Sequence, residues 1–340
     1  MDRSGGWPTW AKGLLAVLVV ALGLVVGAWL HSSLTGSNKT SSVAGVRTAP
    51  STPKRLPVVP VHTDATKLPP ASAGTNRPSQ RQRSGGNEAS LQGSFASLES
   101  GISGTVGLAV VPLGSASIHT YGQLQVGHAW SSMKVPIIVT LMREGALSGE
   151  EESWARSAIT ASDNEAAAAL FSQLESRHGG LTGASLAVQE TLAMSGDTST
   201  QVATAPPPPG AVSTWGQTEW PLSGSVAFYR ALACGGLIGA QSSYVLGLME
   251  EVIGEQQWGL GQAGFPAGTS VAFKAGWGPE AETGGYLVRQ AGIIRHGSSG
   301  LVVTMAAEDA SGTFEAGVAD IDQIASWVGQ HYSALGPAPC

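Results

Sequence analysis

The stretch SSMK (residues 131–134), followed at once by the apolar run VPIIVTLM (residues 135–142), decides how this chain is interpreted. The apolar run predicts a helix that begins close to Ser131. Residues three apart share a helix face, so we expect the Ser131 hydroxyl beside the Lys134 amine at the positive end of the helix dipole. A serine hydroxyl is a poor nucleophile until a base removes its proton, and a desolvated lysine can be that base. Ser132 is one residue too close to Lys134 for this pairing.

Two further short motifs follow along the chain. SDN (residues 162–164) stands between two predicted helices, where the same residue types also serve as ordinary helix caps. KAGW (residues 274–277) stands at the end of a predicted strand, SVAFKAGW, where a strand end followed by a turn is the alternative interpretation. Each motif alone is weak, and their order along the chain is what gives them weight.

Lysine usage strengthens the case for chemistry at these motifs. Residues 87–340 contain six arginines but only two lysines, Lys134 and Lys274, and both lysines fall inside the motifs. An amine can lose its proton near neutral pH, whereas a guanidinium cannot. The pattern therefore indicates that this chain keeps lysine where a neutral base is needed.

Three segments resemble, in this order, the S-x-x-K, S-D-N and K-T-G elements of class A β-lactamases and penicillin-binding proteins: SSMKVP, ASDNEAAAALF and FKAGW. The resemblance covers about residues 87–335. It is closer still to the membrane-anchored serine hydrolases of high-GC Gram-positive bacteria, because the third element has the form K-x-G-W-x-P (residues 274–279). The resemblance implies an α+β fold, with an antiparallel sheet of about five strands, flanking terminal helices and an inserted all-helical lobe.

The resemblance also implies a role for each catalytic residue. Ser131 would attack a carbonyl and form an acyl-enzyme, with Lys134 as its general base. Ser162 would pass a proton toward the leaving nitrogen, and Lys274 would set the electrostatic potential of the site. Backbone N–H groups of Ser131 and Trp277 would form the oxyanion hole.

Substrate binding is assigned by the same resemblance. Asn164 would hold a substrate amide, and Ala275, Gly276 and Trp277 would border the substrate. The threonine of K-T-G is replaced by Ala275, so a hydroxyl that would bind a substrate carboxylate is missing. Arg289, on the following strand, is a candidate to replace that hydroxyl, with a surface role as the alternative.

The loop that carries the deacylating glutamate of class A enzymes departs from the family. The segment between Asp197 and Gln217 contains no carboxylate. The sequence therefore predicts that an acyl-enzyme would be cleared slowly, and that the protein is not an efficient β-lactamase.

The N-terminal part divides into three segments. Residues 1–12 are expected in the cytoplasm, and the uncharged run 13–30 is long enough to span a membrane, with a cleaved signal peptide as the alternative. Residues 31–86 are rich in Ser, Thr and Pro and carry a formal charge of +7, which predicts a disordered linker. The linker is either a solvated tether or a segment that rests on anionic lipid or wall polymer. Residues 87–340, the hydrolase domain, would then lie outside the cell.

Composition limits the partners of that domain. Residues 87–340 carry 8 basic and 22 acidic residues, a formal charge of −14 that argues against nucleic acid. The seven histidines show no metal-ligand spacing, so we expect neither metal nor cofactor. Cys234 and Cys340 either pair, as an oxidising compartment permits, or stay as two thiols. We expect a monomer.

Apolar periodicity predicts the following elements of the domain. The predicted strands are 104–111, 116–121, 269–274, 286–294 and 300–307. The predicted helices are 88–99, 131–143, 152–161, 164–176, 184–194, 223–233, 243–254 and 314–332. Four tryptophans near the motifs either line a cleft or pack in the core: Trp215, Trp220, Trp258 and Trp277.

Two hypotheses of function follow. The first is an enzyme that transfers or hydrolyses an acyl group of a cell-wall-type peptide, amide or ester, or of another small acyl substrate. The second is a degenerate penicillin-binding fold that binds wall peptide or glycan without turning it over. The retained SSMK and SDN motifs favour the first hypothesis, and Ala275 with the missing glutamate favours the second.

Overall fold

The computed structural model describes residues 80–209 and 211–340. The predicted cytoplasmic segment 1–12, the predicted anchor 13–30 and most of the predicted linker lie outside these residues. Within the described part of the chain, no helix is both long enough and apolar enough to cross a membrane. Helix α2 (Gln80–Glu99) begins inside the segment assigned to the linker, ahead of the predicted domain boundary at 87.

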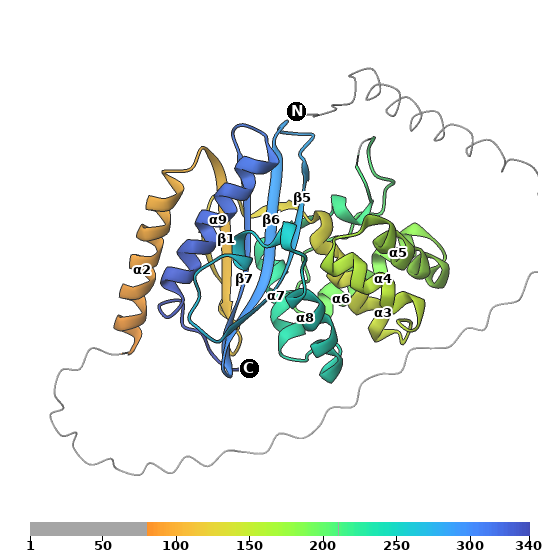
Figure 1. Ribbon diagram of the computed structural model, residues 1–340, viewed down its shortest axis with the longest axis horizontal. Coiled ribbons are helices and arrows are strands. Elements are labelled where there is room, and N and C mark those ends of the chain that lie inside the picture. The colour runs from red at the N-terminus through yellow and green to blue at the C-terminus, as the bar shows by residue number, and fades with distance from the viewer. Residues whose placement is uncertain (1–79, 210) are drawn as a thin grey trace, which may run out of the picture. The chain divides into compact units, whose positions relative to one another are not determined.

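A five-stranded antiparallel sheet forms the centre of the domain (Figure 1). The strand order is β2-β1-β7-β6-β5, so the first two strands form one side of the sheet, with β2 at the edge, and the last three strands form the other side, with β5 at the edge. Hydrogen-bonded ladders join β5 to β6 and β6 to β7 along nearly the full length of each strand. The strands are β1 (Gly104–Pro112), β2 (His119–Gly122), β5 (Thr269–Pro279), β6 (Tyr286–His296) and β7 (Ser299–Asp309).

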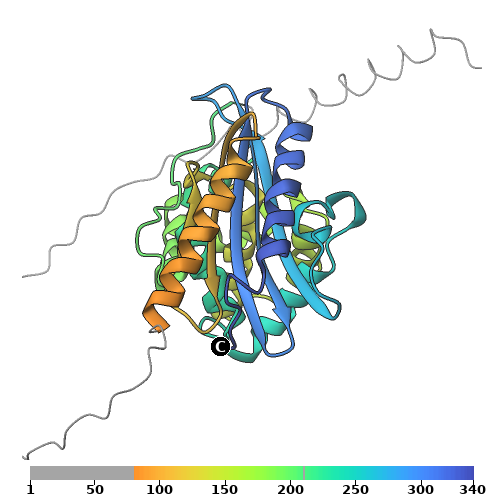
Figure 2. The same ribbon diagram turned by 90° about the vertical axis from the view of Figure 1, so that its left-hand side faces the viewer.

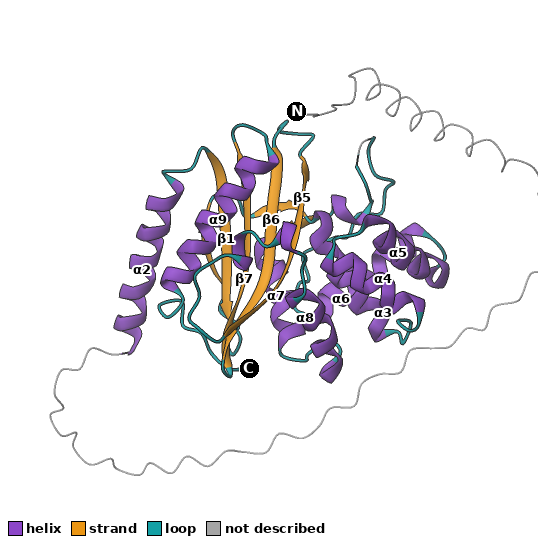
Figure 3. Ribbon diagram, viewed as in Figure 1, coloured by secondary structure: helices purple, strands orange, loops and turns teal. Residues whose placement is uncertain are grey.

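Helices cover both faces of the sheet. Helices α2 and α9 lie side by side on one face, as Figures 1 and 2 show from two directions. On the other face α7 packs against β1 and β7, α8 contacts β5, and the remaining helices form a lobe beyond them (Figure 3). The helices are α3 (Lys134–Arg143), α4 (Glu150–Thr160), α5 (Asn164–His178), α6 (Leu181–Met194), α7 (Leu222–Ala233), α8 (Ser242–Glu250) and α9 (Phe314–His331).

Two buried clusters follow from this layering. One fills the space between the sheet and α2 and α9, and includes the buried α9 residues Ile321, Ala325 and Val328. The other runs from the opposite face of the sheet through α7 into the lobe, where α3 is apolar along almost its whole length. Because the central strands β6 and β7 are covered on both faces, they are nearly continuous buried runs instead of alternating ones.

The α+β architecture is confirmed, and three local features differ from the predicted elements. The SSMK motif lies in a 3-10 turn (Trp130–Met133) that leads into α3, so the α-helix begins at Lys134. β5 continues to Pro279, which places KAGW inside the strand, because pairing with β6 extends that far. A small ribbon of β3 (Val126–His128) and β4 (Glu219–Pro221) has no counterpart among the predicted strands, since three residues carry no periodicity.

The two cysteines of the chain form a disulfide, which settles the alternative that the sequence left open. Cys234 at the end of α7 is bonded to Cys340, with their Cα atoms 5.6 Å apart and a sequence separation of 106. The C-terminal segment is also held by backbone hydrogen bonds between Gly300 and Ala338. The bond therefore pins the end of the chain beside β7 and α7.

Removing this disulfide should lower the stability of the domain without changing its fold. A cross-link that closes a loop of about 100 residues stabilises by roughly 2–4 kcal/mol, chiefly by restricting the unfolded chain. We expect the double variant Cys234→Ser/Cys340→Ser to lose that much in urea unfolding. A reductant should lower the stability of the wild type to the same level and leave the variant unchanged. Equal stability of oxidised and reduced wild type would contradict the prediction.

Candidate active site

Ser131 lies at the junction of the sheet and the helical lobe. It is held in the 3-10 turn that precedes α3, and the neighbouring Ser132 is fully buried, with its hydroxyl donating to the Ala129 carbonyl at 2.5 Å. The Ser132 hydroxyl is therefore used in a hydrogen bond within the turn. This agrees with the expectation that Ser132 is too close in sequence to Lys134 to pair with it. Ser131 is the serine of the motif that reaches the surface of a cavity.

The two lysines of the domain converge on one hydroxyl. Lys134 Nζ lies 3.3 Å from Ser162 Oγ and donates to the Ser162 carbonyl at 2.6 Å and to Asn164 Oδ1 at 2.7 Å. Lys274 Nζ donates to Ser162 Oγ at 2.8 Å and to its own strand at the Ala275 carbonyl. The three motifs, about 140 residues apart at their extremes, therefore meet at Ser162. Within residues 80–209 and 211–340, no hydrogen bond joins the Ser131 hydroxyl to Lys134.

Burial shifts the protonation of both amines. Lys134 is 1 % exposed, and the loss of solvent lowers its pKa to about 7, against a smaller opposing effect of the Asp163 carboxylate. Lys274 is fully buried, and burial together with the nearby Lys134 lowers its pKa well below the usual range. A lysine with such a pKa spends much of its time as a neutral amine near pH 7, the form that accepts a proton.

The SDN motif is both a helix cap and a part of the candidate site, the two interpretations that the sequence allowed. The Asp163 carboxylate accepts from the backbone N–H groups of Glu165 and Ala166, so Asp163 is the N-cap of α5. Its neighbours Ser162 and Asn164 turn the other way and line the cavity. The Asp163 cap determines where α5 begins, and the beginning of α5 in turn positions Ser162 and Asn164 at the cavity.

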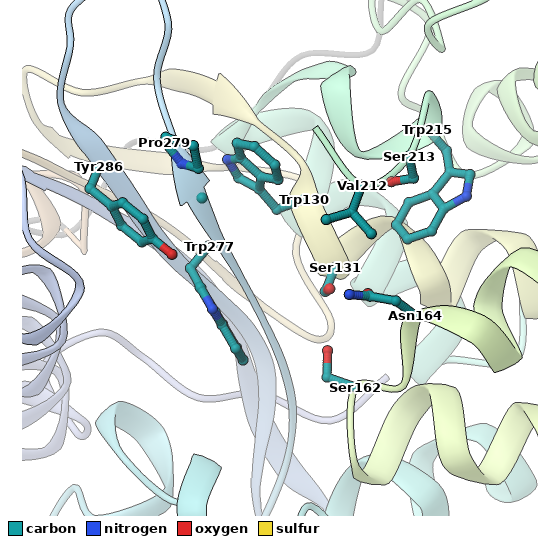
Figure 4. A pocket seen from close by; sticks show the side chains of 11 residues that line it. Trp130, Ser131, Ser162, Asn164, Val212, Ser213, Trp215, Trp277, Pro279 and Tyr286 are labelled. Atoms are coloured by element: carbon teal, nitrogen blue, oxygen red, sulfur yellow. The ribbon is translucent and has the colours of Figure 1, made fainter. Parts of the chain in front are cut away.

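A cavity of about 190 Å³ opens in front of Ser131 (Figure 4). Ser131 lies between two walls, one from β5 and the strand beside it, the other from the lobe and the loop before β4. The lining residues are Trp130, Ser131, Ser162, Asn164, Val212, Ser213, Trp215, Trp277, Gly278, Pro279 and Tyr286.

Backbone strain concentrates at this cavity. Among the described residues, Trp130 (φ 45°) and Ser162 (φ 57°) are the non-glycine residues with positive φ. Such conformations cost about 1–3 kcal/mol each and persist where the surroundings impose them. Trp130 lies directly before Ser131, and Ser162 carries the hydroxyl that both lysines contact. The strained backbone therefore accompanies the orientation of the Ser131 and Ser162 hydroxyls.

Gly276 allows β5 to approach the nucleophile turn. A Cβ atom at this position would lie 2.7 Å from the Ala129 carbonyl oxygen and 2.9 Å from the backbone nitrogens of Ser131 and Ser132. β5 is an edge strand, so the side of its backbone that faces this turn has no strand partner. The approach brings Gly276, the residue before Trp277, to the Ser131 amide. The oxyanion hole formed by the N–H groups of Ser131 and Trp277 stays a prediction.

A hydrogen-bonded clamp holds Trp130 in its strained position. The Trp130 indole N–H donates to Glu280 at 3.1 Å, and Glu280 also bonds His128 Nδ1 at 2.5 Å. The Glu280 carboxylate raises the pKa of His128. The Trp130 ring lies against Gly278, where any side chain would collide with it. No sequence pattern predicts this clamp, because about 150 residues separate its two sides.

The loop before β4 supplies apolar and neutral groups in place of a base. Asp197 is buried and accepts from Thr200, Ser199 and the Trp220 indole N–H, so it is committed to holding the loop. Trp215 packs near Lys134, with the amine 5.8 Å from the ring centroid. The cavity wall that this loop forms therefore carries no carboxylate.

Three predicted substrate-binding residues do not line the cavity: Gly276, which packs against the turn that holds Ser131, and the two residues Ala275 and Arg289. Ala275 is 1 % exposed and packs in the cluster shared with α9, because alternate residues of a strand face opposite sides of the sheet. Arg289 is fully buried, donates to the carbonyls of Gly127 and Trp220, and has its pKa lowered to about 10 by burial. The prediction that Arg289 replaces the missing threonine hydroxyl is wrong, since no substrate can reach it.

The same fold occurs in known enzymes. A class A β-lactamase from Mycobacterium abscessus is 18 % identical, with a TM-score of 0.57, and the match covers 72 % of this chain and 99 % of that one. The fold is that of the class A β-lactamases. The TLA-1 extended-spectrum β-lactamase gives a TM-score of 0.60 at 15 % identity, covering 72 % and 99 % of the two chains. The chromosome-encoded β-lactamase of Vibrio parahaemolyticus gives 0.56 at 17 %, covering 71 % and 98 %.

Comparison by sequence finds no relative of this chain, whereas comparison by structure does. No protein-family model matches the chain, and no curated protein matches it. At these identities the likeness shows the β-lactamase fold, the fold of serine acyl-transfer enzymes, and leaves the substrate open.

Several cavity residues were missed or left open by the sequence. Of the four tryptophans considered, Trp215 and Trp277 line the cavity, whereas Trp220 and Trp258 are core residues. Trp130 directly precedes the nucleophile motif, and this adjacency is the signal that would have found it. Tyr286 carries no such signal, because it reaches the cavity through the pairing of β6 with β5.

Adding a side chain at Gly276 should disable the nucleophile turn before it unfolds the domain. We expect Gly276→Val to slow acylation of Ser131 at least about a hundredfold, since the side chain would force β5 away from the Ser131 amide. The measure is the rate of labelling by a fluorophosphonate, with thermal unfolding as the check of folding. The matched control is Gly247→Val, where the structure offers open space on the helix surface. Equal labelling by both variants would contradict this account.

The lowered pKa of Lys134 predicts the pH dependence of acylation. The neutral amine is the base, so the labelling rate should rise about tenfold per pH unit below pH 7 and level off above it. Lys134→Arg should lose both the rate and the inflection, because a guanidinium keeps its proton throughout this range. A profile that is flat between pH 5.5 and 9, or that bends only near the ordinary lysine pKa, would exclude Lys134 as the base.

Proposed function

We propose that this protein is an extracytoplasmic serine acyl-enzyme hydrolase or transferase that acts on a cell-wall-type peptide, amide or ester, without a cofactor. The single observation that carries the proposal is the convergence of Lys134 and Lys274 on the Ser162 hydroxyl, beside a cavity that Ser131 reaches. Two buried amines with lowered pKa values have little value for stability, and they fit the needs of proton transfer.

In the proposed reaction, Ser131 Oγ attacks the substrate carbonyl carbon as its proton passes to the neutral Lys134 amine. The carbonyl oxygen becomes an oxyanion held by the backbone N–H groups of Ser131 and Trp277. Ser162 then gives its proton to the leaving group and recovers one from Lys134, which returns to its neutral form. The bond to the leaving group breaks and the acyl group stays on Ser131.

Release of the acyl group needs water or another acceptor and a base near it. The wall formed by Val212, Ser213 and Trp215 provides no carboxylate for this purpose. We therefore propose a long-lived acyl-enzyme and no efficient β-lactamase activity, with Lys134 as the available base for a slow second step.

The cellular setting is part of the proposal. The uncharged run 13–30 with basic Lys12 before it supports a single membrane anchor with residues 87–340 outside the cell. The disulfide between Cys234 and Cys340 supports the same setting, because an oxidising compartment preserves such bonds. The K-x-G-W-x-P form of the third motif supports kinship with the membrane-anchored actinobacterial serine hydrolases.

A second candidate function is a module that binds wall peptide or glycan without turning it over. The observation in its favour is the cavity wall, where Trp130, Trp215, Trp277 and Tyr286 offer stacking surfaces to a ligand. A binder of this kind would have no need of two buried amines with lowered pKa values, which is why we place it second.

Labelling separates the two candidates. Incubation of the domain with a fluorophosphonate should add one adduct on Ser131, seen by intact-mass analysis, and Ser131→Ala should abolish it. Lys134→Ala should slow labelling by about two to four orders of magnitude, the usual effect of losing a general base. Ser132→Ala is the matched control and should change labelling little.

The lifetime of an adduct tests the second step. A penicillin adduct, if it forms, should persist for hours, since no carboxylate stands near the attacking water. Failure of any reagent to label Ser131 would favour the binding module, and rapid turnover of nitrocefin would reveal a deacylating base that the cavity wall does not show.

A further inference from the structure

The wall of the cavity in front of Ser131 is electrically neutral. All eleven lining residues are uncharged side chains or glycine, and four of them are aromatic. Figure 4 shows the rings of Trp130, Trp215 and Trp277 around the Ser131 hydroxyl. A wall of this composition favours apolar, aromatic or sugar surfaces and has nothing with which to pair an anion.

The positively charged side chains of the domain do not line the cavity, and the buried Arg289, which keeps Nε and Nη2 without a partner, is among them. None of the six arginines of residues 87–340 lines the cavity, and each donates to a group away from it: Arg143, Arg156, Arg177, Arg230, Arg289 and Arg295. The amine donors of Lys134 and Lys274 are directed at Ser162, Asn164 and the β5 backbone, behind the wall.

Two carboxylates stand beside the wall, and both have partners: Asp163 caps α5 and Glu280 is paired with His128. Asp163 stands between the two lining residues Ser162 and Asn164, and Glu280 follows the lining residue Pro279 and accepts from the Trp130 indole. A carboxylate on the substrate would lose its hydration at this wall and gain no cation in return.

We propose that the site selects acyl donors that are neutral next to the scissile bond, such as an internal amide or ester flanked by an aromatic or apolar group, and rejects donors that end in a free carboxylate there. The inference rests on the proposed function and narrows its substrate class. It departs from the peptide-terminus chemistry that a carboxylate-binding hydroxyl at position 275 would support.

A matched pair of esters tests this preference. 4-Nitrophenyl methyl terephthalate is neutral, and 4-nitrophenyl hydrogen terephthalate differs from it by one free carboxylate, placed too far from the ester to assist its cleavage. At pH 8 we expect kcat/KM for the neutral ester to be at least about tenfold higher, after subtraction of the rate with Ser131→Ala. Equal rates, or a preference for the carboxylate ester, would overturn the inference and leave the proposed acyl-enzyme chemistry in place.

A cation added to the wall should change the preference. Val212 is 63 % exposed and lines the cavity from the loop before β4, so a longer side chain has room there. Val212→Arg should raise kcat/KM for the carboxylate ester several-fold relative to the neutral ester, whereas the neutral control Val212→Gln should not. Identical selectivity of the two variants would count against a wall that discriminates by charge.

Binding to Ser131→Ala keeps the inference testable without catalysis. Ligand-observed NMR compares N-acetylphenylalanine methylamide with N-acetylphenylalanine, which differ in the same terminal group. Stronger binding of the amide supports the inference even if the wild type never acylates, an outcome in which the proposed enzyme fails and the neutral site stands. Binding of the acid as strong as that of the amide would overturn the inference.

Discussion

Two amines buried around one hydroxyl set the conditions for the rest of this structure. Lys134 and Lys274 both contact Ser162 Oγ, at 3.3 and 2.8 Å, so their nitrogens are about 6 Å apart or less. Two positive charges at that separation repel by about 3 kcal/mol in a partly buried protein site, in addition to the cost of removing each from water. Burial and this repulsion both favour the neutral form, and they lower the pKa of each amine.

The surrounding fold holds the two amines close together, although their burial and mutual repulsion cost free energy. The N-cap of α5 fixes Ser162 and Asn164, the edge strand β5 delivers Lys274, and the start of α3 delivers Lys134. The strained φ of Trp130 and Ser162 adds to the cost, and the clamp of Glu280 and His128 helps to hold the first of them. Buried clusters on both faces of the sheet supply the stability against which these costs are tolerated.

The likeness to class A β-lactamases covers almost the whole of those chains at 15–18 % identity. Core positions tolerate many apolar residues of similar size, so the fold survives low identity. The loop before β4 presents Trp215, Val212 and Ser213 to the cavity, and this wall carries no carboxylate.

The sequence by itself determined the layered fold and the identity of the central groups. Apolar periodicity located the five long or paired strands and the eight helices, and the rarity of lysine marked Lys134 and Lys274, because local pattern and chemical type are properties of the chain. Which partners those side chains meet is decided by distant pairings. The strand registry buried Ala275 and Arg289 away from the cavity, and the approach of β5 to the Trp130 turn assembled the clamp with Glu280. The bonds of Arg289 to Gly127 and of Trp130 to Glu280 join residues more than a hundred positions apart, and their free energy exists only once these distant segments have packed together.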